Sequence, residues 1–465
     1  MVASSAPSRI ARTDATAIAS QPFCSPGDRI RAVPEIYAHW PDPEGLLRLR
    51  EAGVTVAIGP PTAAFARACL AAGIAPYAEL PPGASAPPSE FRGLLLDTPD
   101  DLARHKGPHV LVYLNPDQVH RDVAPARPVL RFGQWPGVRS GPNVPGRGIE
   151  VATASREPWV DANSYLVAYL KDLYPQRSPI LGYRPDGPAA SSQGLELALA
   201  EAVMAGGNWI LSLPDDYRAA LLRGDDKALD AWRSLSRTIS FLREQADLFV
   251  QPNRSRVAFA AGTLDQSGEL LRLMFRRNLF PAVVPAQSLP PLAVPRFRAL
   301  VMVNLPPPSG PQRDRVLAFA RAGGTVITTG WSPPAAAQTR ADPDRDFHTL
   351  GQGRIVTYRA PIADPSEFAL DVIDILGVRT RDLRLWNAGA VIGHVQGSGA
   401  RAVLHLVNYG DLIEEFPARV DGLFRQATLR EPGSANPRPV PAVKRGQTTE
   451  VTVQRLGRLA TIVLL

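Results

Sequence analysis

A repeat in residues 33–249 constrains the fold most strongly, because short apolar runs alternate there with loops and amphipathic segments. Apolar runs of this length, separated by helices, are typical of parallel strands buried on both faces. We predict eight strands, near residues 33–38, 54–58, 74–79, 93–97, 109–114, 128–132, 179–184 and 208–213. Eight parallel strands with intervening helices in ~220 residues predict a (β/α)8 barrel. We assign an extra extended piece at 149–153 to a long excursion after the sixth strand.

The alternation restarts on a smaller scale in residues 252–378, which predicts a small open α/β sheet. We expect its strands at 257–260, 282–284, 299–304 and 325–329, and helices at 267–278 and 311–322. A last helix has Asp364 as its N-cap and Pro365 at its first position, with Gly377 after its end. The Pro- and Asp-rich segment 331–350 is predicted to be a loop.

Residues 379–465 carry short alternating runs separated by Gly, Pro and Asn, which predict an antiparallel β-sandwich. Residues 1–32 are rich in Ala, Ser, Thr, Pro and Arg and are predicted to be a disordered segment. The expected organisation is therefore a disordered segment (1–32), a barrel (33–251), an α/β domain (252–378) and a sandwich (379–465).

Composition excludes several function classes. The formal charge is +7, but the 51 basic residues are scattered, which argues against nucleic acid as a partner. No run approaches ~18 uninterrupted apolar residues, so we expect no membrane span and a protein that is soluble, in a compartment that the sequence leaves open. Two cysteines, Cys24 and Cys69, form neither a four-ligand zinc site nor a disulfide framework. No phosphate-binding loop and no metal-ligand histidine spacing occurs, so we expect no cofactor and no metal.

Three segments carry a resemblance to a known group of proteins. LALAEAVMAGGNWILSL (197–213) is similar to the last helix–strand step of glycosidase barrels, and RAGGTVITTG (321–330) to a step of class I glutamine-amidotransferase-like, flavodoxin-like domains. AVLHLVNYGD (402–411), with LREPGS (429–434), is similar to the terminal sandwich of such proteins. The order of domains resembles glycoside hydrolase family 42, the multidomain β-galactosidases, and related hypothetical glycosyl-hydrolase-like proteins. The resemblance implies a carbohydrate ligand and a possible homo-oligomer formed through the middle domain, which lacks cysteine.

Glycoside hydrolysis needs two carboxyl groups that flank one bond, and barrel sites lie at the C-terminal ends of strands. The family places glutamates after strands four and seven, and the resemblance puts Asp97 and Asp186 at these positions. Other clans, acting on α-galactosides or α-fucosides, use an aspartate nucleophile at strand four, which Asp97 also resembles. Asp97 has an alternative role as N-cap of a helix starting at Pro99, and Asp186 as a turn residue between Pro185 and Gly187.

The segment SREPWVDANS (155–164) supplies a rival carboxyl group, Glu157, beside Trp159. A tryptophan next to a glutamate favours a raised pKa and can stack on a sugar face. The alternative is a loop that ends in an Asp161 helix cap. We expect further substrate contacts from side chains near strand ends, namely Glu35, Tyr37, Trp40, Trp135 and Tyr183.

Two functions follow from these residues. The first is a glycoside hydrolase that uses Asp97 with Asp186 or Glu157 at the barrel mouth. The second is a catalytically degenerate barrel that binds a glycan or acts as a scaffold. The second is motivated by the missing Asn-Glu step of the family, by the shortness of the barrel and by acids in capping or turn contexts.

Overall fold

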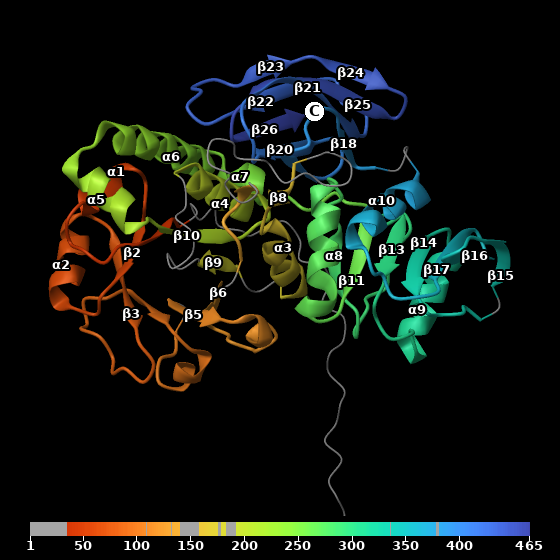
Figure 1. Cartoon of the computed structure of the whole chain (residues 1–465), viewed down its shortest axis with the longest axis horizontal. Coiled ribbons are helices and arrows are strands. Elements are labelled where there is room, and N and C mark those ends of the chain that lie inside the picture. Colours follow the sequence, from red (N-terminus) through yellow and green to blue (C-terminus); the bar gives the residue numbers. More distant parts are fainter. Residues whose placement is uncertain are drawn as a thin grey trace, which may run out of the picture. The chain divides into compact units, whose positions relative to one another are not determined.

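The computed structural model describes residues 35–107, 109–131, 133–139, 158–174, 178–182, 192–334, 336–377 and 381–465. Its first part is a closed barrel of eight parallel strands, in which each strand pairs with its neighbours in register and the last pairs with the first (Figure 1). The predicted barrel is therefore confirmed. In order around the barrel the strands are β1 (Tyr37–His39), β2 (Val56–Gly59), β3 (Ala75–Leu80), β4 (Gly93–Leu96), β5 (Val110–Leu114), β6 (Arg127–Leu130), β9 (Ile180–Gly182) and β10 (Asn208–Ser212).

The ring of helices around the barrel is uneven. Its α-helices are α1 (Leu46–Glu51), α2 (Ala63–Ala71), α3 (Ser164–Leu173), α4 (Ser192–Met204), α5 (Asp215–Arg223), α6 (Asp226–Glu244) and α7 (Ala246–Phe249). No helix joins β3 to β4, and only the 3-10 turns η1 (Pro99–Ala103) and η2 (Pro116–Gln118) follow β4 and β5. Prolines at 81, 82, 87 and 88 are consistent with the absence of a helix between β3 and β4, because proline cannot continue a helix interior. The last long barrel helix, α6, ends at its C-cap residue Gln245, which is followed directly by the short helix α7.

A seven-stranded sheet follows, and its central strands are parallel. The strand order is β12 (Ala282–Pro285), β11 (Val257–Ala261), β13 (Ala299–Met302), β14 (Thr325–Thr329), β17 (Gly353–Tyr358), β16 (Arg345–Leu350) and β15 (Ala337–Ala341). Its helices are α8 (Leu264–Arg276), α9 (Gly310–Arg321) and α10 (Pro365–Leu376). The predicted loop at 331–350 is wrong, since β15 and β16 form an antiparallel edge there. Every residue of β15 is exposed, so this strand carries no apolar signal in the sequence.

The C-terminal part is a sandwich of two antiparallel sheets, as the sequence predicts. One sheet contains β18 (Leu383–Leu385), β21 (Ile413–Asp421), β25 (Thr448–Leu456) and β24 (Ala442–Arg445). The other contains β19 (Val391–Gln396), β20 (Ala402–Asn408), β26 (Leu459–Leu464), β22 (Ala427–Arg430) and β23 (Arg438–Val440). Leu404, Phe416 and Ile462 belong to the apolar core of the sandwich.

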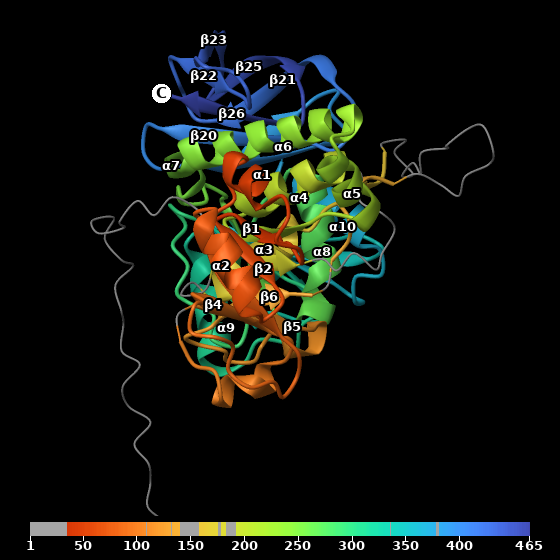
Figure 2. The same ribbon diagram turned by 90° about the vertical axis from the view of Figure 1, so that its left-hand side faces the viewer.

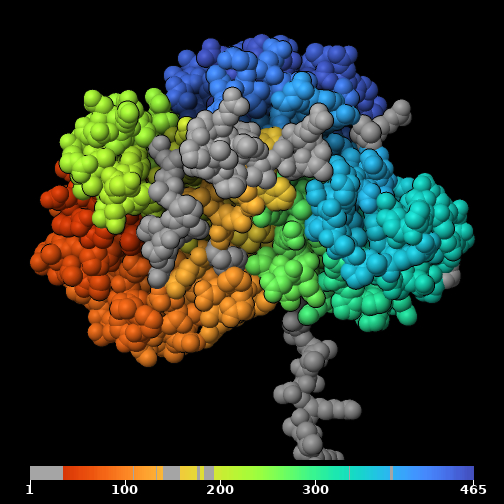
Figure 3. All heavy atoms as spheres, in the orientation of Figure 1, coloured from red at the N-terminus to blue at the C-terminus, as the bar shows by residue number. Residues whose placement is uncertain are grey.

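The sandwich lies against the barrel helices, which the outer face of β19 and β20 contacts (Figures 1, 2 and 3). One apolar cluster joins the barrel, the α/β sheet and this face. His394 and His405 lie opposite each other in register at this contact. His405 lies 3.1 Å from the Leu248 carbonyl oxygen and stacks on Phe249 with a centroid distance of 4.3 Å. Burial lowers the pKa of His405 to about 3, so its ring is a neutral part of the interface.

Among the described helices, none combines the length and the apolar character that a membrane crossing requires.

Candidate functional site

The barrel interior is filled by side chains, so chemistry is confined to its ends. Tyr37, Ile58, Tyr77, Leu95 and Tyr113 belong to one buried cluster, separate from the apolar layer outside the barrel. Side chains on a strand alternate between its two faces, so residues two positions beyond these inward side chains also face the axis. At the C-terminal ends of the strands most of these positions carry polar side chains, although Pro60 follows Ile58.

Four of these polar side chains pair with one another, and we call them the mouth quartet: His39, Glu79, Asp97 and Arg131. They come from β1, β3, the residue after β4 and the residue after β6. Their side chains are between 22% and 31% exposed, which leaves all four within reach of a ligand. The structure thus places Asp97 at the mouth, where the sequence predicts it.

The quartet forms two pairs, each made of one carboxylate and one nitrogen-containing side chain. His39 Nε2 lies 2.9 Å from Glu79 Oε2. Arg131 donates to the Asp97 carboxylate and, at 3.2 Å, to the Asp97 carbonyl oxygen. The Arg131 guanidinium also lies over the Tyr113 ring, 4.2 Å from its centroid, which fixes its orientation. Each carboxylate therefore has a nitrogen donor beside it: an imidazole that can exchange a proton, or a guanidinium that keeps its charge.

The alternative role of Asp97 as a helix cap is wrong. Thr98 is the N-cap of η1, and its hydroxyl accepts a hydrogen bond from the backbone N–H of Asp100 at 3.4 Å. Because Thr98 caps the turn, the Asp97 side chain is left to bind Arg131 across the mouth.

Glu35 and Tyr37 lie at the opposite end of the barrel, because they precede and open β1 rather than follow it. Arg127, the first residue of β6, donates to the Glu35 carboxylate at 2.9 Å and to the Tyr37 hydroxyl at 2.6 Å. Tyr37 also donates to Glu35, and its side chain is fully buried. This cluster closes the N-terminal end of the barrel.

The predicted tryptophans are engaged in packing. Trp40 is 1% exposed, and its indole N–H donates to the Glu44 carbonyl oxygen at 2.6 Å. Trp135 follows β6 and packs on Trp209 with a centroid distance of 5.8 Å. Trp159 is partly exposed, and the guanidinium groups of three arginines lie over its ring at 5.0–5.6 Å, namely Arg139, Arg272 and Arg276.

Asp161, beside Trp159, pairs with Arg139 at 2.7 Å and also with Arg272, while Asn163 is the N-cap residue of α3. The expected Asp161 cap is therefore wrong. Glu157, Tyr183 and Asp186 lie outside the described residues, as does the extended piece at 149–153.

A buried polar network supports the segment that follows β6. Glu201, on α4 and fully buried, accepts hydrogen bonds from the Asn163 backbone at 3.0 Å, from Asn163 Nδ2 at 2.8 Å and from the Tyr409 hydroxyl at 2.7 Å. Asn163 Oδ1 in turn accepts from the Gln134 backbone N–H at 2.8 Å. Burial raises the pKa of Glu201 to about 7. The network ties the sandwich, through Tyr409, to the segment three residues beyond Arg131.

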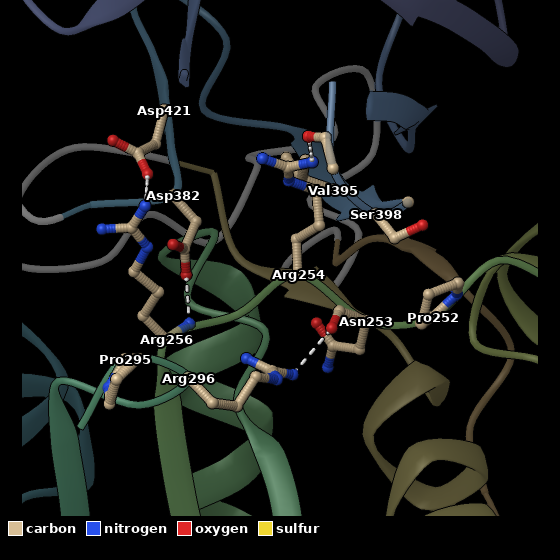
Figure 4. Close-up of a pocket in the computed structure, with 12 residues that line it drawn as sticks. Pro252, Asn253, Arg254, Arg256, Pro295, Arg296, Asp382, Val395, Ser398 and Asp421 are labelled. Carbon is tan, nitrogen blue, oxygen red and sulfur yellow. Dashed lines mark hydrogen bonds and ion pairs between the residues drawn. The ribbon is translucent and has the colours of Figure 1, made fainter. Parts of the chain in front are cut away.

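Figure 4 shows a separate cavity of about 370 Å³, lined by the connection after the barrel, by the α/β sheet and by the sandwich. Arg254 donates to the carbonyl oxygens of Gly399 and Arg401 at 3.1 and 3.0 Å, and Arg256 pairs with Asp421 at 2.7 Å. Arg296 donates to the Asn253 carbonyl oxygen at 2.7 Å. These contacts join the connecting segment to both neighbours, and we assign the arginines a structural role.

Within the described ranges, no group of three or more His, Cys, Asp or Glu side chains is arranged to hold a metal ion.

No family model matches the sequence, and a comparison with the curated proteins finds no match. Solved structures do match. The chain is similar to α-L-fucosidase isoenzyme 2 from Paenibacillus thiaminolyticus, with a TM-score of 0.58 and 9% identity over 93% of this chain and 99% of that one. It is also similar to the cold-adapted β-galactosidase from Rahnella sp. R3, with a TM-score of 0.53 and 10% identity over 92% and 98%.

The chain therefore has the glycoside-hydrolase-like barrel fold, with a following sheet and a sandwich, that its sequence resembles. At these identities the likeness establishes the fold, and the reaction has to be argued from the site.

Sequence reasoning did not select three members of the quartet, His39, Glu79 and Arg131. His39 meets Glu79 across 40 residues of chain, and Arg131 meets Asp97 across 34, so no local spacing announces either pair. Their positions in the sequence could have indicated them, because each lies two residues after a strand residue whose side chain faces the barrel axis.

Proposed function

We propose that the chain is a glycoside hydrolase that cleaves a carbohydrate at the C-terminal mouth of the barrel, with Asp97 and Glu79 as its two carboxyl groups. The observation that carries the proposal is the mouth quartet itself: two partly exposed carboxylates on the neighbouring strands β3 and β4, each beside a cationic or proton-exchanging partner. The fold shared with a fucosidase and a galactosidase supports it.

The two pairs suit the two roles that glycoside hydrolysis requires. One carboxyl group protonates the leaving oxygen, and the other attacks the anomeric carbon or activates water. We assign the proton transfer to Glu79, because the His39 imidazole beside it can exchange a proton with it. We assign the second role to Asp97, because Arg131 donates to its carboxylate and orients it across the mouth.

Asp186 and Glu157 stay in the proposal as alternative partners of Asp97, since both follow predicted strands or border the loop over the mouth. Trp135 and Trp159 are partly exposed on the segments after β6, and we propose that a sugar ring approaches the quartet past them. Tyr183 follows the seventh barrel strand and is proposed to contact the same ligand.

The test is hydrolysis of a panel of aryl glycosides by the full chain and by three variants. Glu79→Gln and Asp97→Asn remove one mouth carboxylate each, and Glu35→Gln removes a carboxylate at the other end of the barrel. We expect a loss of about 10³-fold or more in kcat/KM for both mouth variants, and a near-normal rate for Glu35→Gln.

Two results would overturn the proposal. Turnover that survives both mouth substitutions would remove the quartet from the reaction, and survival in Asp97→Asn and Glu157→Gln would exclude the rival pair as well. Tight binding of a glycan without hydrolysis of any glycoside would instead establish the degenerate, binding-only barrel.

A further inference from the structure

A wide, positively charged groove lies between the barrel helices and the sandwich. Its volume is about 830 Å³, and it is lined by α4, α6, the turn after β22, β23 and the hairpin that joins β25 to β26. In Figures 1 and 2, α6 runs beside this edge of the sandwich. No residue of the barrel strands is among those that line it, so the groove is separate from the mouth quartet.

Arginine dominates the lining of this groove. Four arginines and two glutamates face it: Arg237, Arg438, Arg455 and Arg458, with Glu196 and Glu431. Arg438 donates to the Gln454 carbonyl oxygen at 3.1 Å, and Arg458 donates to the Gly410 carbonyl oxygen. A carbonyl oxygen accepts a hydrogen bond but does not neutralise a charge, so the guanidinium groups keep the groove positive.

The two glutamates offset only part of this charge. Glu196 is 6% exposed, and its carboxylate accepts from the Thr238 hydroxyl at 3.4 Å and from Ser234. Burial raises the pKa of Glu196, and the charges of Arg458 and Arg237 counteract that rise. With both glutamates ionised the six side chains carry two positive charges more than negative ones.

The backbone at Arg455 adopts a positive φ that arginine rarely takes. Four described residues other than glycine have a positive φ, and three of them are asparagines, the side chain that best tolerates it. The fourth is Arg455, at φ 55°, one residue before the end of β25. A strained conformation kept at a charged residue that lines a groove is typical of a functional position.

We propose that this groove binds an anionic oligosaccharide through its carboxylate or sulfate groups, at a site distinct from the mouth quartet. That the ligand is a carbohydrate rests on the proposed function, and that it is anionic rests on the arginines of the groove. Guanidinium groups bind such oxyanions with paired hydrogen bonds, and the volume is far larger than a single small ion needs.

The residues that line the groove also indicate which kind of anion it binds. No aromatic side chain is among the residues that line the groove, so neither the face of a neutral sugar nor a nucleic-acid base finds a stacking partner there. Recognition by charge alone favours a sugar acid or a sulfated sugar.

The experiment is calorimetric titration of the full chain with hexasaccharides of equal length that are carboxylated, sulfated or neutral. Arg455→Gly and Arg237→Ala each remove one charge from the groove, and glycine also relieves the strain at position 455. The matched control is Arg233→Ala, which removes one charge from the same helix but from a side chain paired with Asp230 outside the groove. All titrations are repeated in the Asp97→Asn chain, so that groove binding is measured without mouth chemistry.

We expect binding of one or both acidic hexasaccharides, weakening as salt increases, and no binding of the neutral one. Arg455→Gly and Arg237→Ala should each lower the affinity about tenfold, Arg455→Gly without lowering the melting temperature, and Arg233→Ala should leave the affinity unchanged. Absence of acidic-sugar binding, equal weakening by Arg233→Ala, or equal competition by single-stranded nucleic acid would overturn the proposal. Hydrolysis that fails while acidic sugars still bind would refute the proposed function alone.

Discussion

Removing the Tyr409 hydroxyl should destabilise the protein more at alkaline than at acidic pH. The hydroxyl donates to the fully buried Glu201 carboxylate at 2.7 Å, and this hydrogen bond favours the ionised form. Burial still raises the pKa of Glu201 from 4.5 to about 7. Glu201 is therefore neutral in the folded protein at pH 5.5 and ionised at pH 8.5.

The sign of the effect follows from these two values. A carboxyl group whose pKa is raised by folding costs no stability below pH 4.5, and its cost grows as the pH rises from 4.5 to about 7 and is complete above 7. The rise of about 2.5 pH units corresponds to roughly 3 kcal/mol, reached above pH 7. Tyr409→Phe removes a donor to the ionised form, so the pKa of Glu201 should rise further and the cost above pH 7 should increase.

The magnitude is the difference between two kinds of hydrogen bond. A hydrogen bond to a charged group contributes about 1.5–3 kcal/mol, and one between neutral groups about 0.5–1.5 kcal/mol. We expect Tyr409→Phe to lower the free energy of unfolding by about 1 kcal/mol at pH 5.5 and by about 2–3 kcal/mol at pH 8.5. Urea unfolding followed by tryptophan fluorescence at both pH values measures the difference.

Tyr169→Phe is the matched control. Its hydroxyl donates to the uncharged Gly262 carbonyl oxygen, also at 2.7 Å, so its loss should be the same at both pH values. Equal losses for Tyr409→Phe at pH 5.5 and 8.5 would refute the reasoning about Glu201.

Three further predictions concern the barrel, the α/β sheet and the sandwich. Gly93→Ala should destabilise the chain by ~2 kcal/mol or more in urea unfolding, because a Cβ there would lie 2.3 Å from the Tyr77 ring; unchanged stability would contradict the tight approach inside the barrel. Thr263→Ala should cost ~1 kcal/mol, since its side chain caps α8 in a capping box with Gln266, and a loss below measurement would contradict that role. His405→Asn should cost stability at pH 7 and progressively less as the pH falls from 6 to 4, by about 1.4 kcal/mol per pH unit, because folding lowers the pKa of His405 from 6.5 to about 3. A cost that stays constant over this range would show that His405 is not held neutral.

The barrel could be predicted because parallel strands are buried on both faces and leave continuous apolar runs in the sequence, as in β5, where all five residues are buried. The edge strand β15 left no such run, since its AQTRA segment is exposed throughout. Position relative to the axis was harder to predict. Tyr37 opens β1 instead of following it, which places Glu35 and Tyr37 at the far end of the barrel.

The sequence predicted a site residue only where a carboxylate directly follows a predicted strand. Asp97 follows the fourth strand, and that position is enough to place it at the mouth. Its partner could not be predicted, because Thr98 and Asp97 compete for the same helix cap and only the geometry shows which side chain takes it. Pairs such as His39 with Glu79 form by closing the barrel, so they exist in the fold and not in any local pattern.

In the proposed reaction, Asp97 at the barrel mouth acts directly on the sugar. Azide rescue tests it: the Asp97→Gly variant, which lacks the carboxylate, is assayed with an aryl glycoside that the wild type hydrolyses, with and without sodium azide. We expect azide to restore aryl release and to yield a glycosyl azide, because the small anion takes the place of the missing carboxylate. Wild-type turnover in the variant without azide would contradict it.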